Sequence, residues 1–95
     1  MASVERAYEQ IAEFAQKRGA RRVVLFGSRA RHDAGPKSDI DIAVEGCSDF
    51  PAFYEDVQER LWSLLRVDVV NLDECASDDL RDSIDRDGMV IYEAV

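Results

Sequence analysis

Apolar residues recur along this chain with two different spacings, and together they predict helices that alternate with strands. Over residues 4–18 they return every three or four positions, which predicts an amphipathic helix; its apolar members are Val4, Ala7, Tyr8, Ile11, Phe14 and Ala15. Residues 21–26 (RRVVLF) are a short apolar run that is bounded by Gly27. A run of that length predicts a buried strand that ends at the glycine.

The rest of the chain continues this alternation. Residues 28–31 predict a short helix, residues 32–38 (HDAGPKS) a loop, and residues 39–45 (DIDIAVE) a second strand. A second long helix follows a cap at Ser48 or Asp49, with apolar positions at Phe53, Val57, Leu61, Leu64 and Leu65. The next predicted element is a strand at 67–71. A helix follows that Ser77 caps and Gly88 ends, with Leu80 and Ile84 on its apolar face. The last predicted element is a strand at 89–93.

This order of elements predicts the fold class. Strands that alternate with helices are typical of an α/β sheet with helices packed on it. The chain has 95 residues, of which 46% are hydrophobic, so we expect a single domain over residues 1–95 with a modest core. In such sheets the functional crevice usually lies at strand ends, and Gly27-Ser28 lies at one of them.

Charge narrows the range of partners. The formal net charge is -8, which disfavours binding to duplex nucleic acid because that needs a basic face. The positive charges gather in one third of the chain, at Arg18, Arg21, Arg22, Arg29, Arg31 and Lys37. Two interpretations remain open: an ordinary solvated surface, or a local site for a polyanion beside a broad acidic surface for a basic protein.

Composition also bears on location and on metal chemistry. No apolar run approaches the roughly 20 residues of a membrane span, and the first ten residues lack a signal-peptide core. We therefore expect a cytoplasmic protein in which Cys47 and Cys75 are free thiols. These cysteines and His32 do not have the spacing of zinc ligands.

Two aspartates interrupt the second predicted strand. Asp39 and Asp41 are two positions apart, so their side chains point to the same face of the strand, while Ile40 and Ile42 point to the other. Adjacent carboxylates repel each other unless a cation lies between them, and Mg²⁺ prefers oxygen ligands of this kind. The alternative is an edge strand whose outer face is simply in water.

Two further features favour a site over a wet edge. Gly27 lets a phosphate approach the backbone closely, and Ser28 adds a hydroxyl donor. If a helix begins there, its free N–H groups can also bind the phosphate. Gly-Ser is, however, common in turns. Asp68 is a third carboxylate inside a Val-rich strand, where a lone charge is costly. If that strand pairs beside residues 39–45, three carboxylates surround one site, as in two-metal phosphoryl or nucleotidyl transfer. Otherwise Asp68 is a surface residue on an edge strand.

One stretch of the chain consists of Gly27-Ser28, ten further residues, and then Asp39-Ile40-Asp41. It resembles the G-S-x10-D-x-D motif of minimal nucleotidyltransferases in the polymerase-beta-like superfamily. RVDVVNLDE (66–74) is similar to the family segment that brings the third acidic residue, and DGMVIYE (87–93) to its last strand. His32 stands where the family commonly has glycine. The resemblance implies the nucleotidyltransferase fold, an α/β (α+β) arrangement in which helices flank a small mixed sheet of three to four strands.

The resemblance also implies roles for individual residues. Gly27 and Ser28 would hold the triphosphate of ATP; Asp39, Asp41 and Asp68 would ligate Mg²⁺, two ions being expected, and Asp68 would also act as general base. From charge and position alone we add three contacts to the triphosphate, namely Arg29, Arg31 and Lys37. The equal alternative is that these residues lie in an ordinary solvated loop.

Chains of this length resemble MNT-domain antitoxins, which are understood to adenylylate a tyrosine of a HEPN-domain ribonuclease toxin. Small-molecule nucleotidyltransferases and polymerases carry extra domains for the acceptor, so the partner itself is expected to supply that surface here. Three functions remain open: transfer of AMP to such a toxin, an antitoxin that inhibits mainly by complex formation, and a nucleotidyltransferase for RNA or a small molecule.

Overall fold

The computed structural model describes residues 4–27, 39–61, 66–74 and 77–94. Within them the chain forms three helices and four strands, α1 (Val4–Lys17), β1 (Arg22–Phe26), β2 (Ile40–Glu45), α2 (Phe50–Glu59), β3 (Val67–Asn71), α3 (Asp78–Asp87) and β4 (Met89–Glu93). The predicted strands agree with these bounds to within one residue. The predicted short helix at 28–31 and the loop at 32–38 lie outside the described residues.

The strands form a mixed sheet in the order β3-β2-β1-β4. β1 pairs antiparallel with both β2 and β4, whereas β2 and β3 pair in parallel. Parallel strands need a crossover rather than a tight turn, and α2 lies in the connection that runs from β2 to β3. The prediction of a small mixed sheet flanked by helices is confirmed.

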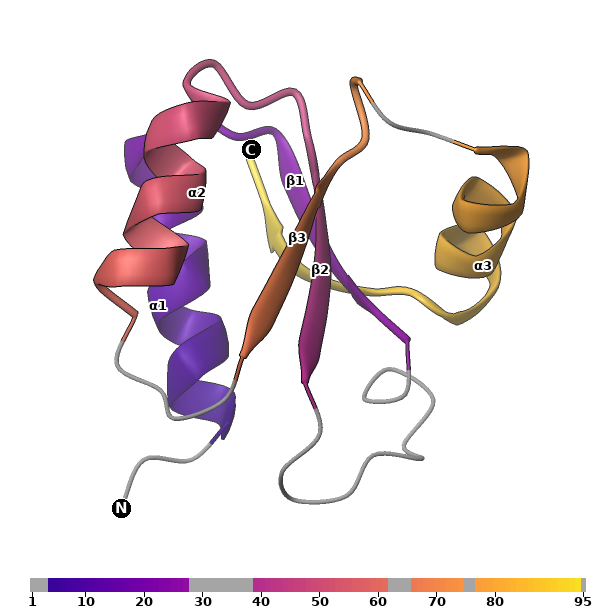
Figure 1. Ribbon diagram of the computed structural model, residues 1–95, viewed down its shortest axis with the longest axis horizontal. Helices are drawn as coiled ribbons and strands as arrows, with labels where there is room; N and C mark the ends of the chain where they lie inside the picture. Colours follow the sequence, from indigo (N-terminus) through magenta and orange to yellow (C-terminus); the bar gives the residue numbers. More distant parts are fainter. Residues whose placement is uncertain (1–3, 28–38, 62–65, 75–76, 95) are drawn as a thin grey trace.

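Helices cover both faces of the sheet (Figure 1). α1 and α2 pack on one face, over a core of fully buried side chains that includes Ile11, Val23, Leu25, Ile40, Ile42, Val44 and Phe53. α3 packs on the other face over a smaller cluster formed by Val24, Ala43, Leu72 and Ile84. Among the described residues, no helix is long and apolar enough to cross a bilayer.

Side-chain caps fix where α2 and α3 begin, and one predicted boundary is wrong. Asp49 accepts a hydrogen bond from the Ala52 N–H at 3.3 Å, and Ser77 accepts one from the Leu80 N–H at 3.2 Å. α2 ends at Glu59, so Leu61, which we expected within this helix, lies beyond it. Leu61 still packs against the core, and its apolar spacing reflects that contact rather than helix. Leu64 and Leu65 lie outside the described residues.

A buried ion pair ties α2 to the end of α1. Asp56 is 2% exposed, and its carboxylate accepts hydrogen bonds from Arg18 Nε at 2.8 Å and from Arg18 Nη2 at 3.3 Å. Arg60 Nη1 lies 3.3 Å from the same carboxylate. Hydrogen bonding from Arg18 outweighs the effect of burial and lowers the pKa of Asp56.

We expect Asp56→Asn to lower the free energy of unfolding by about 2–3 kcal/mol at pH 7, because it leaves Arg18 without its anionic partner. Since the pKa of Asp56 is lower in the folded chain, its stabilisation is present above about pH 4 and is lost as the pH falls through the folded pKa. Urea denaturation at pH 7 and pH 3 measures this.

The gap between parent and variant should therefore be smaller at pH 3 than at pH 7. Glu59→Gln is the matched control, since it removes an exposed charge from the same helix. An Asp56→Asn deficit that persists unchanged at pH 3 contradicts this account of the ion pair.

Candidate functional site

The parallel register of β2 and β3 places Asp41 directly opposite Asp68. Asp39 comes just before β2, two residues from Asp41, and therefore lies on the same face. Asp41 is half-buried, whereas Asp39 and Asp68 are exposed. The structure thus brings together at one end of the sheet the three carboxylates that the sequence singled out.

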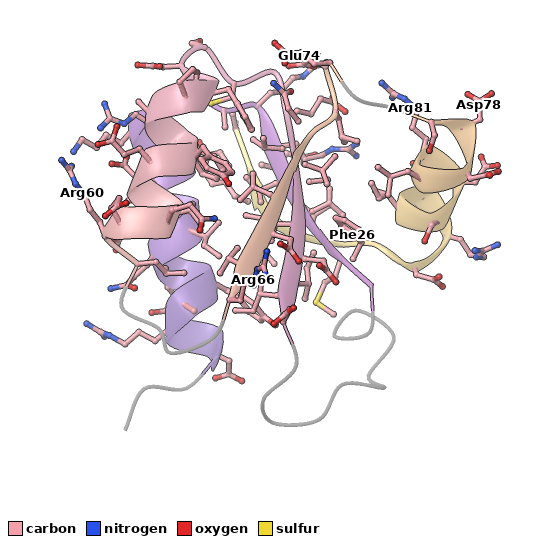
Figure 2. The ribbon with its side chains drawn as sticks, viewed as in Figure 1. Phe26, Arg60, Arg66, Glu74, Asp78 and Arg81 are labelled. Carbon is pink, nitrogen blue, oxygen red and sulfur yellow. The ribbon has the colours of Figure 1, made fainter. Side chains whose placement is uncertain are left out.

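The face that carries these carboxylates is the one that α3 covers. Asp41 lies opposite Phe26 of β1 in the antiparallel register, so the two side chains share a face. Phe26 packs against the cluster under α3 and points to that side of the sheet (Figure 2). β2 is an internal strand, so the alternative that Asp39 and Asp41 belong to an edge strand is wrong. Asp68 does lie on an edge strand, with 49% of its side chain exposed.

Asp41 is in an unfavourable place for a negative charge. Burial, then the charges of Asp68 and Asp39, and a side-chain hydrogen bond with Asp68 all raise its pKa. Negative charge is therefore crowded around Asp41, and a bound cation would relieve the repulsion. Such perturbed carboxylates are typical of functional sites, although structural networks also produce them.

Gly27 approaches the carboxylate of Asp41 more closely than any other residue type could. Its φ is 78°, and a Cβ atom built on it would lie 2.5 Å from Asp41 Oδ2. Glycine is therefore required here for two reasons, the left-handed backbone and the space beside the carboxylate. The Asp41 carboxylate therefore lies directly against the backbone at the point where β1 ends.

The donor set suits magnesium. Among the described residues no three His, Cys, Asp or Glu side chains are placed to hold one ion together. Mg²⁺, however, usually takes one or two carboxylates and completes its octahedron with water and substrate phosphates. The pair formed by Asp41 and Asp68, with Asp39 nearby, fits that pattern.

The predicted nucleotide contacts are only partly described. Gly27 is placed next to Asp41, whereas the other predicted contacts lie outside the described residues, as does His32; they are Ser28, Arg29, Arg31 and Lys37.

The sequence reasoning missed Arg66. Its Nε lies 3.6 Å from Asp68 Oδ1. Its position two residues before Asp68, at the start of a strand, was the available indication, because residues so spaced share a face.

A cavity of about 310 Å³ lies at the opposite end of β1 and β2, lined by Arg21, Arg22, Glu45, Glu93 and Ala94. Its two arginines and two glutamates balance in charge, and it contains none of the clustered carboxylates. We therefore locate the functional site at the carboxylates rather than in this cavity.

Proteins similar to this chain are known. A family model described as "Polymerase beta, Nucleotidyltransferase" matches residues 9–94. That range contains all four strands and the three clustered carboxylates. No curated protein matches the chain.

Three solved structures, each a toxin–antitoxin complex, are similar to this chain. One was crystallised with AMP-PNP; it is 27% identical with a TM-score of 0.72, over 92% of this chain and 73% of that one. A second, an MntA-HpeT complex with a double aspartate-to-glutamate mutation, is 25% identical with a TM-score of 0.69 over the same shares, 92% and 73%. A third, MntA-HepT, is 21% identical with a TM-score of 0.66, over 95% of this chain and 73% of that one. At this identity it shows a similar fold and nothing more. The predicted fold is confirmed.

We expect Gly27→Ala to disturb both the backbone and the carboxylate of Asp41. The left-handed φ costs about 1–2 kcal/mol for a residue with a Cβ atom, and the clash displaces a metal ligand. Thermal unfolding and a Mn²⁺ titration followed by electron paramagnetic resonance measure the two effects. Mn²⁺ affinity should fall several-fold.

Gly46→Ala is the matched control. Gly46 has a φ of 64°, and its Cβ would meet Arg21 Cβ at 2.8 Å, away from the carboxylates. It should lose stability without losing Mn²⁺ affinity. Equal Mn²⁺ affinity in the two variants would show that Gly27 does not shape the cation site.

Proposed function

This chain belongs to the polymerase beta nucleotidyltransferase family, and from that premise we propose that it is an antitoxin that transfers AMP from ATP to a tyrosine of a HEPN-domain toxin. Members of the family typically use a metal ion and a nucleoside triphosphate. The proposal adds the nucleotide, the acceptor and the biological role to that family activity.

The pairing of Asp41 with Asp68 carries this proposal. Two carboxylates face each other on neighbouring strands, Asp39 adds a third charge, and the Gly27 backbone lies directly against the Asp41 carboxylate. A sheet that had only to fold would gain stability from apolar side chains at these positions. The arrangement supports cation and phosphate binding at this end of the sheet.

The proposed reaction joins the tyrosine oxygen to the α-phosphorus of ATP and breaks the bond from that phosphorus to pyrophosphate. Asp39, Asp41 and Asp68 would hold magnesium, which when bound would stabilise charge on the phosphoryl oxygens. Asp68 accepts the proton of the tyrosine hydroxyl, whose ordinary pKa is near 10. Gly27 admits the phosphates to the backbone, with Ser28, Arg29, Arg31 and Lys37 as the further contacts that we propose.

The relatives support a protein partner. Chains similar to this one were crystallised within toxin–antitoxin complexes, one of them with AMP-PNP. The net charge of -8 suits association with a basic protein, since opposite charge speeds and orients encounter. The same complexes favour one alternative, in which the antitoxin inhibits the toxin by binding alone.

We expect Asp41→Asn to reduce transfer roughly a thousandfold, because metal stabilisation of the transferring phosphoryl group contributes several kcal/mol. Asp39→Asn should act in the same direction. The assay incubates the protein with its toxin, ATP and Mg²⁺ and follows the toxin's mass; chelation with EDTA should abolish the added mass.

Without Mg²⁺, Asp41→Asn should also unfold at a higher temperature than the parent at pH 7. The raised pKa of Asp41 means that ionisation there destabilises the fold, and that stability rises as the pH falls through that pKa. Asp85→Asn removes an exposed charge from α3 rather than from the strands that carry the cluster and should change neither property. Normal transfer by Asp41→Asn refutes the metal assignment.

Asp68→Asn separates the enzyme from the binding alternative. The substitution is nearly isosteric, so β3 and the surface around it should persist. We expect this variant to co-purify with the toxin but to add no mass to it, and to fail to protect cells that express the toxin. Full protection without added mass would instead support inhibition by binding.

A further inference from the structure

Arg66 lies directly before β3, at the end of the sheet that holds the carboxylates. The Ile40 N–H donates a hydrogen bond to the Arg66 carbonyl oxygen at 2.9 Å, and Ile40 lies opposite Val67 in the parallel register. One residue earlier on each chain segment, Asp39 and Arg66 occupy neighbouring positions. The backbone thus fixes Arg66 beside the cluster.

Its side chain shares the face of the carboxylates. Arg66 and Asp68 are two residues apart in extended chain, so both point to the same side of the sheet. Arg66 Nε lies 3.6 Å from Asp68 Oδ1, with 77% of the Arg66 side chain exposed. Figure 2 shows the Arg66 side chain lying over the lower part of the sheet. Arg66 therefore places a positive charge beside a site crowded with negative ones.

The strand order places Arg66 on one particular side of the site. β3 is an edge strand, and β2 separates it from β1, where Gly27 lies. Adjacent strands are about 4.8 Å apart, so Arg66 and Gly27 are separated by roughly 10 Å across the sheet. In the proposed reaction the triphosphate lies at Gly27, which leaves the edge beside Asp68 and Arg66 for the acceptor.

We propose that Arg66 is a positioning residue that holds the Asp68 carboxylate toward the acceptor; this inference rests on the proposed transfer reaction. Asp68 faces the negative charges of Asp41 and Asp39 and is linked to Asp41 by a side-chain hydrogen bond. The Arg66 guanidinium is the cation that contacts Asp68 among the described residues, and it favours one orientation of that carboxylate. An exposed ion pair of this kind contributes little to stability. Its effect is on the geometry of the general base, where a displacement of 1 Å is costly.

The kinetic test compares Arg66→Gln with Arg66→Lys. We expect Arg66→Gln to lower kcat for toxin modification about tenfold to a hundredfold, while KM for ATP changes less than about twofold, because Arg66 does not contact the phosphates. Arg66→Lys keeps the charge and should recover part of the rate.

Arg86→Gln is the matched control. Arg86 is 72% exposed and its Nε lies 3.5 Å from Asp87 Oδ2. The Arg86→Gln variant therefore loses the same charge and a similar ion pair, but on α3 rather than beside β3. It should behave as the parent. A raised KM for ATP in Arg66→Gln, with kcat unchanged, would make Arg66 a phosphate contact and overturn the inference. Identical kinetics of Arg66→Gln and Arg86→Gln overturn it as well.

A second measurement does not depend on activity. The Arg66 Nε–H resonance, assigned by its loss in Arg66→Lys, should shift in Asp68→Asn and stay in place in Asp85→Asn. If the parent transfers no nucleotide to the toxin, the proposed function fails and this resonance alone decides the role of Arg66. A resonance that Asp68→Asn leaves unmoved shows that Arg66 does not hold Asp68.

Discussion

The parallel pairing of β2 with β3 is the constraint on which the site depends. Buried apolar side chains on both strands, among them Ile40, Ile42 and Val67, fix the register on the face that α1 and α2 cover. Because side chains alternate along a strand, a slip of one residue would turn Asp41 into that core. The burial that stabilises the fold is thus also what holds Asp41 and Asp68 opposite each other on the other face.

Asp56 and Asp41 show how the environment of a carboxylate distinguishes a structural role from a functional one. Asp56 is enclosed but receives two hydrogen bonds from Arg18, and its pKa is lowered. Asp41 is less enclosed, faces other carboxylates, and has a raised pKa. The first carboxylate is satisfied within the fold and stabilises it at neutral pH. The Asp41 carboxylate faces further negative charges, which is the electrostatic condition for a cation site.

Much of the fold could be predicted because local pattern and tertiary packing agree. Apolar runs predicted the strands at 67–71 and 89–93, and the structure confirms both. Capping chemistry predicted Ser77 and either Ser48 or Asp49 as caps; Ser77 is confirmed, and Asp49 is the cap of α2. Leu61 was placed wrongly because periodicity reports contact with the core, which continues after a helix ends.

The candidate site was predictable for a different reason. Asp39 and Asp41 share a strand face by alternation alone, but their proximity to Asp68 depends on which strands pair, and the chain pattern does not state that. The motif resemblance supplied the pairing. Arg66 was missed because an exposed arginine at a strand start has no distinctive pattern; only the register beside Asp39 and the contact with Asp68 show its position.

Among the described residues, the two sides of the carboxylate cluster differ in exposure, and that difference is consistent with the protein acceptor that we propose. On the β1 side Asp41 is half-buried and Gly27 lies close against it, as suits a ligand group held tightly at the backbone. On the β3 side the described residues form an open sheet edge, with Asp68 and Arg66 largely in solvent. A small molecule is usually held in a concave pocket that excludes water. A hydroxyl carried on a protein brings its own surface to cover the edge, so an open edge suffices for such an acceptor.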